Sequence, residues 1–544
     1  MAEFNYPPIH FQTNPEKYVH WTVSYNGEVA NVMMNVQIDK PMWEGRYELK
    51  SSSYDLAVDI ELNDIVQRMR FEHPEIKVVL VSSANDKVFC AGANIPMLGT
   101  SPHAFKVNFC KYTNETRCSI EDATEHSGQT WVAALNGTAS GGGYELALAC
   151  EKIYLIDDGN AAVSLPEVPL LGVLPGTGGL TRLTDKRKIR RDISDLFCTK
   201  AEGFRSRKAL KYKLIDGAFP KSKWDDGMTK VAEDIAGTIA NKNGDLSPMI
   251  LPEITSQDDD TTWNYEFLTV VVEERIATIT VRSSSATPVR SVDTWSLKMF
   301  RELEDALIRL RFNHLPVGLL IIKTEGSADD VKTHEAWVAD NAPNDWFIKE
   351  IELFQARTLR KLDNMSKSIF ALIEEGSCFV GTLFEMALSG DRIYMFLDDD
   401  EQNSVELTTA NQGRFPMANG WTRIAARFQN DQSSIEEAFS HIGETLNAED
   451  ALDCGLVSDA LDDIDYEDEV RIAIEERLSF SPDALTGMEQ NLRFGGAECM
   501  ENKIYGRLSA WQNWIFQRPN AVGERGALTM YEKPEQPIFD YRRT

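Results

Sequence analysis

Hydrophobic and polar positions follow two periods along the first third of the chain. Residues 21–36 alternate around Asn26-Gly27, which predicts a hairpin of two strands. Apolar residues recur at three-to-four spacing over 54–70, which predicts a helix, and V-V-L-V-S-S at 78–83 predicts a buried strand. A mixed helical stretch, a strand and a glycine-led helix within 136–150 follow. Strands that alternate with helices indicate an α/β fold.

A weaker copy of this pattern begins at Phe267. F-L-T-V-V-V-E-E-R-I-A-T-I-T-V repeats the opening hairpin, V-G-L-L-I-I-K-T-E-G at 317–326 repeats the strand at 78–83, and 375–396 repeats 136–156. The second copy keeps one glycine, Gly381, where the first copy has three. We therefore expect a duplicated architecture in which the chemistry of the glycine loops belongs to the first copy.

The boundaries of these parts follow from the loss of periodicity. The stretch 241–262 is polar, contains prolines and has no period, as linkers do. Helical patterns dominate from about residue 467 onward. We expect a catalytic domain at 1–240, a linker at 241–262, a degenerate second domain at 263–466 and a helical C-terminal region at 467–544.

Composition narrows the classes of protein. The formal net charge is −29, which argues against nucleic acid as a partner, so an anionic ligand needs a local basic patch. No run approaches the roughly 18 apolar residues of a membrane span, and the N-terminus has no secretory pattern. The eight cysteines are scattered without metal-ligand spacing. We expect a cytoplasmic protein with reduced thiols and no metal or membrane partner.

Three consecutive glycines, Gly141, Gly142 and Gly143, lead into a helical pattern. Unpaired N–H groups at a helix start favour negative charge, and glycine lets a ligand approach the backbone closely. The loop F-C-A-G-A-N at 89–94 offers a second set of backbone donors after a strand. Each loop alone is also consistent with a tight turn or close helix packing. Together they predict an oxyanion hole.

These loops, followed by S-L-P-E-V-P-L-L-G-V-L-P-G-T-G-G-L-T-R-L at 164–183, resemble the crotonase (enoyl-CoA hydratase/isomerase) superfamily over the whole first copy. The resemblance implies the crotonase-like ββα superhelix. It also implies that the N–H groups of Ala93 and Gly142 bind a thioester oxygen beside Gly92 and Gly141.

Glu145 and Glu167 match the paired glutamates of that superfamily. One carboxylate held ionised and one held protonated can act as base and acid on a water, and Glu145 near a helix start is the better anion. Taken alone, Glu145 is also a favourable first-turn charge and Glu167 an exposed loop acid. Cys110 lies between the two glycine loops and is either a further acid/base in the acyl pocket or a small buried hydrophobe.

The sequence departs from the superfamily at two positions near these motifs. P-E-V-P-L-L-G carries one residue more than the common pattern, which could place Glu167 differently, and Asn94 stands where an aspartate is usual. Gly176, Gly178 and Gly179 are not followed by Gly-Lys-Ser/Thr, so we do not expect an ATP-type phosphate loop.

The whole chain is similar to the benzoyl-CoA-dihydrodiol lyase family, which combines a crotonase unit, a degenerate second unit and a helical tail. That resemblance implies cleavage of 2,3-epoxybenzoyl-CoA with two waters to 3,4-dehydroadipyl-CoA semialdehyde and formate, without metal, flavin or nicotinamide. It also implies that Lys533 reaches the nucleotide of CoA and that the assembly is small, a homodimer. Two alternatives stay open, namely an enoyl-CoA hydratase of unusual length and a non-catalytic acyl-CoA-binding protein.

Overall fold

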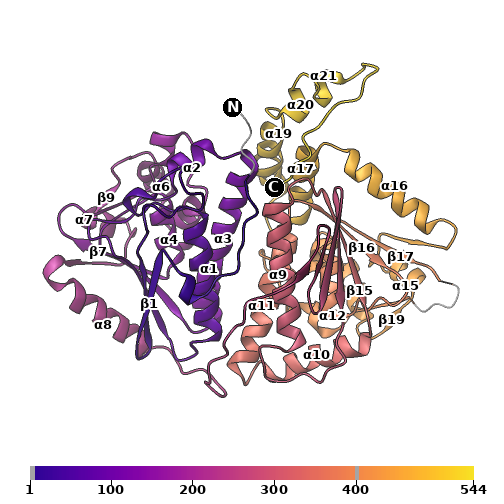
Figure 1. Cartoon of the computed structure of the whole chain (residues 1–544), viewed down its shortest axis with the longest axis horizontal. Coiled ribbons are helices and arrows are strands. Elements are labelled where there is room, and N and C mark those ends of the chain that lie inside the picture. Colours follow the sequence, from indigo (N-terminus) through magenta and orange to yellow (C-terminus); the bar gives the residue numbers. More distant parts are fainter. Residues whose placement is uncertain (1–5, 399–402) are drawn as a thin grey trace. The chain divides into compact units, whose positions relative to one another are not determined.

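The computed structural model describes residues 6–398 and 403–544 and divides the chain into two compact units. The first unit comprises 12–253 with the short segment 344–346, and the second comprises 254–343 and 347–544 with the described residues up to Phe11. Figure 1 colours the first unit indigo to magenta and most of the second orange to yellow. No helix within the described ranges is both long and apolar enough to cross a membrane.

A six-stranded sheet forms the centre of the first unit. Its order is β1-β2-β3-β5-β7-β10, in which β1 and β2 are antiparallel and the other neighbours are parallel. The strands are β1 (Trp21–Asn26), β2 (Val29–Met34), β3 (Val78–Ser83), β5 (Thr130–Leu135), β7 (Lys152–Asp157) and β10 (Gly217–Pro220). The hairpin predicted over 21–36 and the strand predicted over 78–83 are thereby confirmed.

The helices of the first unit lie around this sheet (Figure 1). They are α1 (Leu56–Phe71), α2 (Ile95–Thr100), α3 (His103–His126), α4 (Gly142–Ala149), α5 (Gly179–Thr181), α6 (Arg191–Cys198), α7 (Ser206–Lys211) and α8 (Trp224–Ala236). Helix α8 packs its Met228, Ala232 and Ala236 against Leu80 and Val132 of the central strands. Helix α1 begins where the Asp55 carboxylate accepts from two backbone N–H groups.

A second, smaller sheet in the first unit carries the glycine loops. Its strands are β4 (Val88–Cys90), β6 (Thr138–Ser140), β8 (Ala162–Ser164) and β9 (Phe204–Arg205), in that order. Strands β4, β6 and β8 are parallel, so the loops that follow them leave the sheet at one edge. This common edge brings residues 91–94, 141–145 and 166–167 together.

The second unit repeats this architecture. Its eight-stranded sheet has the order β11-β12-β13-β14-β15-β16-β17-β20, and from β13 onward one antiparallel pair is followed by parallel neighbours, as in the first unit. The strands are β11 (Gln257–Asp258), β12 (Thr262–Asn264), β13 (Leu268–Glu273), β14 (Ile276–Arg282), β15 (Leu319–Glu325), β16 (Ser368–Ile373), β17 (Arg392–Phe396) and β20 (Asp459–Leu461). Strands β18 (Val405–Glu406) and β19 (Thr445–Leu446) form a separate pair.

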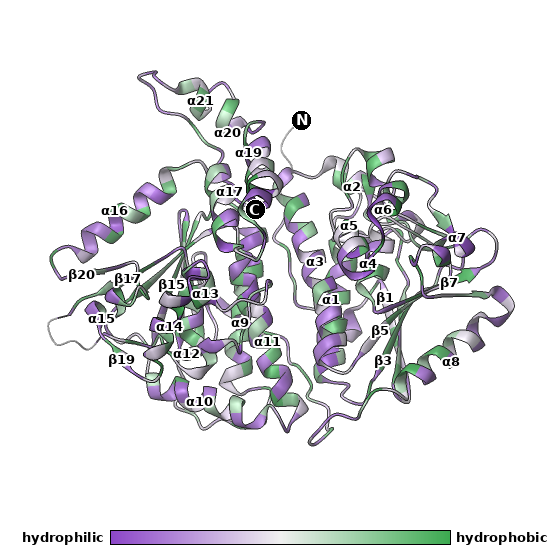
Figure 2. Cartoon of the chain, turned by 180° about the vertical axis from the view of Figure 1, so that it is seen from behind, coloured by the Kyte–Doolittle hydropathy of each residue, from purple (hydrophilic) through white to green (hydrophobic). Residues whose placement is uncertain are grey.

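The helices of the second unit are more numerous, because they include the C-terminal region. They are α9 (Trp295–Asn313), α10 (Ala328–Asn341), α11 (Trp346–Asp363), α12 (Gly381–Leu388), α13 (Arg423–Arg427), α14 (Gln432–Ser440), α15 (Ala448–Asp453), α16 (Tyr466–Ser479), α17 (Pro482–Arg493), α18 (Met500–Asn502), α19 (Ser509–Ile515), α20 (Pro519–Val522) and α21 (Ala527–Met530). Residues of α16 pack on Leu319 and Phe370 of the sheet, as α8 packs on the first sheet. In Figure 2 both helices alternate hydrophilic and hydrophobic colours, as half-buried helices do.

The α/β fold, the duplication and the helical C-terminal region agree with the sequence analysis. One difference concerns the stretch 241–262, for which only a linker was expected. Strand β11 and the start of β12 lie at its end and extend the second sheet by two antiparallel strands. The polar T-T-W-N run hides this strand because only Trp263 of β12 is buried.

Candidate active site

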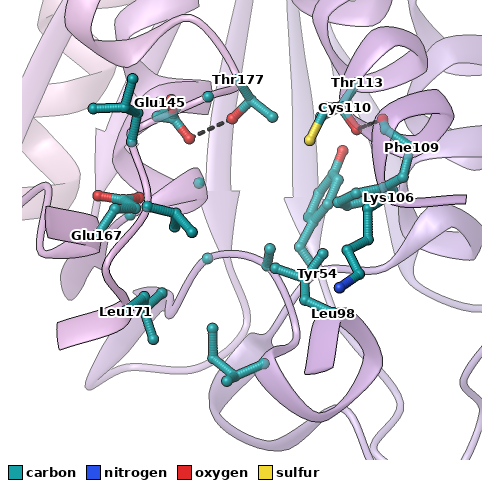
Figure 3. A pocket seen from close by; sticks show the side chains of 18 of the residues that line it. Tyr54, Leu98, Lys106, Phe109, Cys110, Thr113, Glu145, Glu167, Leu171 and Thr177 are labelled. Atoms are coloured by element: carbon teal, nitrogen blue, oxygen red, sulfur yellow. Dashed lines mark hydrogen bonds between the residues drawn. The ribbon is translucent and has the colours of Figure 1, made fainter. Parts of the chain in front are cut away.

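A cavity of about 480 Å³ opens in the first unit beside the glycine loops. Its walls are the loop after β4, the start of α4, one face of α3 and the turns that follow β8. Apolar side chains dominate the lining, including Ile95, Leu98, Phe109, Leu171 and Val173. Figure 3 shows Glu145 and Glu167 on one side of this cavity and Cys110 and Tyr54 on the opposite side.

The two glycine loops touch at the floor of the cavity. Gly92 has a φ of +87°, and a Cβ built there would lie 2.8 Å from the Gly142 nitrogen. A Cβ on Gly142 would lie 3.2 Å from the Ala93 nitrogen. Within the described residues, neither of these two N–H groups donates a hydrogen bond to the protein. They can therefore donate together to one oxygen atom placed between them.

Helix α4 starts at this point. Gly141 is its N-cap residue, and its own N–H is bound to the Ser164 carbonyl at 2.9 Å. The Gly142 N–H is the first of the helix and has no intrahelical acceptor. The carbonyl of Gly142 accepts from Arg117 Nη2 at 2.9 Å. The helix dipole and this buried guanidinium both add positive potential beside the two free N–H groups.

Glu145 lies one turn into α4 and is 3% exposed. Its carboxylate accepts from the Thr177 hydroxyl and, at 2.8 Å, from the Gly179 N–H. A Cβ on Gly179 would lie 2.8 Å from Glu145 Oε1, so glycine is required for this approach. The P-G-T-G-G loop thus binds a carboxylate of the protein itself. Both donors are neutral groups, so these contacts fix the position of the Glu145 carboxylate without pairing it with a cation.

Glu167 lies on the same side of the cavity as Glu145, at the start of a π-helical turn, Glu167–Leu171. The P-E-V-P-L-L-G run with its additional residue falls in this turn, and π-helical turns are frequent at functional sites. Glu167 is 7% exposed, and its Oε2 has no hydrogen-bond partner among the described residues. Burial, together with the negative charge of Glu145, raises the pKa of Glu167 to about 7.

Cys110 projects from α3 into the cavity, with its sulfur toward the side of Glu145 (Figure 3). Burial and the charge of Glu145 raise the pKa of its thiol to about 11, although Arg117 acts in the opposite direction. Cys110 is therefore a neutral thiol at physiological pH. All eight cysteines are free.

Sequence reasoning missed five polar residues that line the cavity, namely Tyr54, Lys106, Thr113, Arg117 and Thr177. Arg117 is 2% exposed, and its guanidinium lies 5.8 Å from the centre of the Tyr54 ring. The Tyr54 hydroxyl donates to Asp59, whose pKa burial raises to about 6 despite the attraction of Arg117. Lys106, Thr113 and Arg117 recur with Cys110 at three-to-four-residue spacing on one face of α3. This periodic signal, and Thr177 inside the P-G-T-G-G motif, were within reach of the sequence.

Two further residues named in the sequence analysis, Asn94 and Lys533, do not line this cavity. Asn94 is buried and caps α2 by accepting from the Met97 N–H at 3.0 Å, so the amide replaces the usual aspartate in a structural contact. Lys533 lies in the second unit, is exposed and does not line this cavity. Its contact with CoA stays a prediction.

The corresponding position of the second unit is filled by the protein itself. Glu385 lies four residues after Gly381, as Glu145 lies four after Gly141, and it accepts from Arg423 Nη1 at 2.7 Å. Thr382 takes the place of Gly142, and its N–H donates to Glu335 Oε2 at 2.7 Å. A carboxylate of the chain thus occupies the place where the first unit offers its free N–H group.

Comparison with known proteins agrees with these features. A sequence model of the enoyl-CoA hydratase/isomerase family matches residues 52–249. The benzoyl-CoA-dihydrodiol lyase of Aromatoleum evansii is 48% identical over 545 residues, which cover 98% of each chain.

Among solved structures, an enoyl-CoA hydratase of Geobacillus kaustophilus is 32% identical, with a TM-score of 0.36, over 40% of this chain and 75% of that one. An enoyl-CoA hydratase of Bacillus anthracis is 26% identical, with a TM-score of 0.34, over 40% of this chain and 77% of that one. From the match to the family model and the whole-length identity to the lyase, this chain belongs to the enoyl-CoA hydratase/isomerase (crotonase) family and, within it, to the benzoyl-CoA-dihydrodiol lyases.

Proposed function

We propose that this chain cleaves the ring of 2,3-epoxybenzoyl-CoA with two waters, giving 3,4-dehydroadipyl-CoA semialdehyde and formate. The observation that carries this proposal is the 48% identity to a benzoyl-CoA-dihydrodiol lyase across 98% of both chains. The cavity supports it, because about 480 Å³ of mainly apolar space suits an acyl group derived from an aromatic ring. The reaction is balanced by water alone, so we propose no metal, flavin or nicotinamide.

The thioester oxygen would bind between the N–H groups of Ala93 and Gly142. Charge that an incoming nucleophile brings to the ring is then delocalised onto that oxygen, where two backbone donors and the start of α4 stabilise it. Arg117 donates to the carbonyl of Gly142 and so helps to keep this residue in place. These hydrogen bonds stabilise the negatively charged transition state more than the bound substrate, since both donors are fixed before the reaction.

Glu145 and Glu167 would share the proton transfers. The two hydrogen bonds to Glu145 fix its carboxylate in place, which suits a base that activates water. The pKa of about 7 lets Glu167 give and take a proton at physiological pH, which suits the acid that protonates the opening epoxide. Cys110 would act as a neutral polar contact to the ring rather than as a nucleophile, because its pKa is far above neutrality.

Formate release tests the proposal. The chain is incubated with 2,3-epoxybenzoyl-CoA generated in place by its oxygenase, and formate is quantified for wild type, Glu145→Gln and Glu167→Gln, with crotonyl-CoA as control substrate. We expect formate from the wild type and a loss of at least about a hundredfold in both variants. Hydration of crotonyl-CoA without formate would identify a long enoyl-CoA hydratase. No turnover of either substrate would identify an acyl-CoA-binding protein.

The oligomeric state and the cellular location are also part of the proposal. We propose a cytoplasmic homodimer, since a fused second unit can cover a surface that other crotonases cover with a separate subunit. Light scattering of the purified chain tests this directly, and a trimer or hexamer would contradict it.

A further inference from the structure

The duplication allows one ion pair of the first unit to be compared with its counterpart in the second. In the first unit, Arg187 Nε and Nη2 donate to the Lys213 carbonyl at 2.9 and 2.6 Å, and Nη1 pairs with Asp216 Oδ2 at 2.9 Å. The same Asp216 oxygen accepts from the Ile153 N–H at 2.8 Å, at the start of β7. Arg187 therefore has a backbone partner and a carboxylate partner.

The second unit keeps the arginine and the backbone partner but has no carboxylate at this place. Arg427 Nε donates to the Gly455 carbonyl at 2.6 Å. Ser458 stands where the first unit has Asp216, because its hydroxyl accepts from the Ile393 N–H at 3.0 Å at the start of β17. Within the described residues, no ion pair or further hydrogen bond of Arg427 replaces the lost contact. Burial alone lowers the pKa of Arg427 to about 10.

Arg427 lines a cavity of about 410 Å³ in the second unit, enclosed by α13, α16, α17 and the start of β17. Arg477 lies on the same cavity and is 5% exposed, and its Nε has no partner in the described parts of the chain. The carboxylates nearest to Arg477 Nη2 belong to Asp391 and Glu489, at 3.8 and 3.9 Å. Both are engaged at shorter range, Asp391 by Arg493 at 2.5 Å and Glu489 by Arg543 at 2.6 Å.

Positive charge exceeds negative charge in this network. Its members are the arginines 392, 423, 427, 477, 493 and 543 and the carboxylates of Asp363, Glu385, Asp391 and Glu489. The surplus is local, since residues 251–544 contain 53 Asp and Glu against 28 Lys and Arg. Cations held away from water without a close anion are costly, and an anion bound beside the half-buried Arg427 and the buried Arg477 would reduce that cost.

Apolar side chains form part of the wall. Leu388 is buried, whereas Met488 and Leu492 are 44% and 59% exposed at the edge of the cavity. Exposed apolar side chains next to convergent charged donors are typical of sites for small organic ligands. A guanidinium also matches the planar fork of a carboxylate.

We propose that this cavity is a second ligand site, which binds a small carboxylate with an apolar body. Arg427 and Arg477 hold the carboxylate, and Leu388, Met488 and Leu492 contact the apolar part. The site lies in the second unit. There, Glu335 fills the position that corresponds to the first cavity, so the site is separate from the proposed reaction. The substitution of an aspartate by Ser458 is what makes Arg427 available.

Calorimetry of the full chain with benzoate as probe tests the site, with inorganic phosphate as a second arm. Two variants should weaken binding at this site by different means. Arg427→Gln removes the cation, and Ser458→Asp supplies an internal carboxylate in the geometry that Asp216 has in the first unit. Arg187→Gln is the matched control, because Arg187 already has its carboxylate partner. Melting temperatures check that each variant folds.

We expect wild type and Arg187→Gln to bind benzoate alike, and Arg427→Gln and Ser458→Asp each to bind about tenfold more weakly or worse. Formate release stays unchanged in both variants. Equal binding of benzoate by wild type and both variants, or no binding at all, would overturn the site. If phosphate binds as tightly as benzoate and is lost in the same variants, the anion site stands and its preference for an apolar body is wrong.

Discussion

A methyl group added to Gly142 probes the proposed oxyanion hole with one atom. In Gly142→Ala, the new Cβ lies 3.2 Å from the Ala93 nitrogen and 3.5 Å from Gly92 Cα. It therefore occupies the space between the two N–H groups, where the thioester oxygen would bind. The φ of Gly142 is not positive, so alanine fits the backbone there.

The expected loss of activity follows from the hydrogen bonds that the added methyl group would block. Loss of one oxyanion donor typically costs about 100- to 1000-fold in kcat, or about 3 kcal/mol. The methyl hinders access to both donors, so kcat/KM for formate release should fall by at least that factor. Alanine is favoured over glycine inside a helix by about 1 kcal/mol, but at this first helical position the 3.2 Å contact with the Ala93 nitrogen requires a small backbone shift. The melting temperature of Gly142→Ala should therefore stay within a few degrees of wild type, and it is measured alongside activity.

Gly99→Ala is the control. Gly99 also lines the cavity, but a Cβ there meets no atom within 4 Å. Formate release is measured for both variants at several concentrations of the acyl-CoA. If Gly142→Ala folds and keeps activity within about threefold of Gly99→Ala, the thioester oxygen does not bind between Ala93 and Gly142.

Three further changes test individual contacts. Thr177→Val removes a hydrogen-bond donor from the Glu145 carboxyl group, so kcat/KM for formate release should fall by about 10- to 100-fold, and Thr177→Ser should keep most of it. Glu167 has a pKa of about 7 when folded against its ordinary 4.5, so its ionisation costs stability progressively as the pH rises from 4.5 through 7. Glu167→Gln should therefore raise the melting temperature at pH 8 more than at pH 5, and an equal shift at both pH values would contradict the raised pKa. Glu385→Gln leaves the buried charge of Arg423 short of a partner, which should lower the free energy of unfolding by about 3 kcal/mol while formate release stays within twofold of wild type.

The sequence predicted those parts of the molecule that have a periodic or spaced signal. The strand at 78–83 ends where predicted, because a continuous apolar run bounded by polar residues leaves little freedom of assignment. Glu145 and Glu167 line one cavity, as their motifs indicated.

The rest depended on contacts between distant segments. The bond from Thr177 to Glu145 joins residues 32 apart, and that from Arg117 to Gly142 joins residues 25 apart. No local pattern encodes either. The π-helical turn at Glu167 shows a third limit, since the additional residue was visible but the backbone that absorbs it was not.

The two units show how the same helix-borne glutamate can serve two purposes. Glu145 accepts from a hydroxyl and a backbone N–H, which hold it without neutralising its charge, and free N–H groups lie beside it. Glu385 accepts from a guanidinium, which neutralises it. The decisive change is at Gly142, since Thr382 in its place adds a hydroxyl that, with its N–H, binds Glu335. Once a carboxylate of the chain fills that position, a thioester oxygen has no free donor there, so the second unit can keep the fold of the first while losing the means for its chemistry.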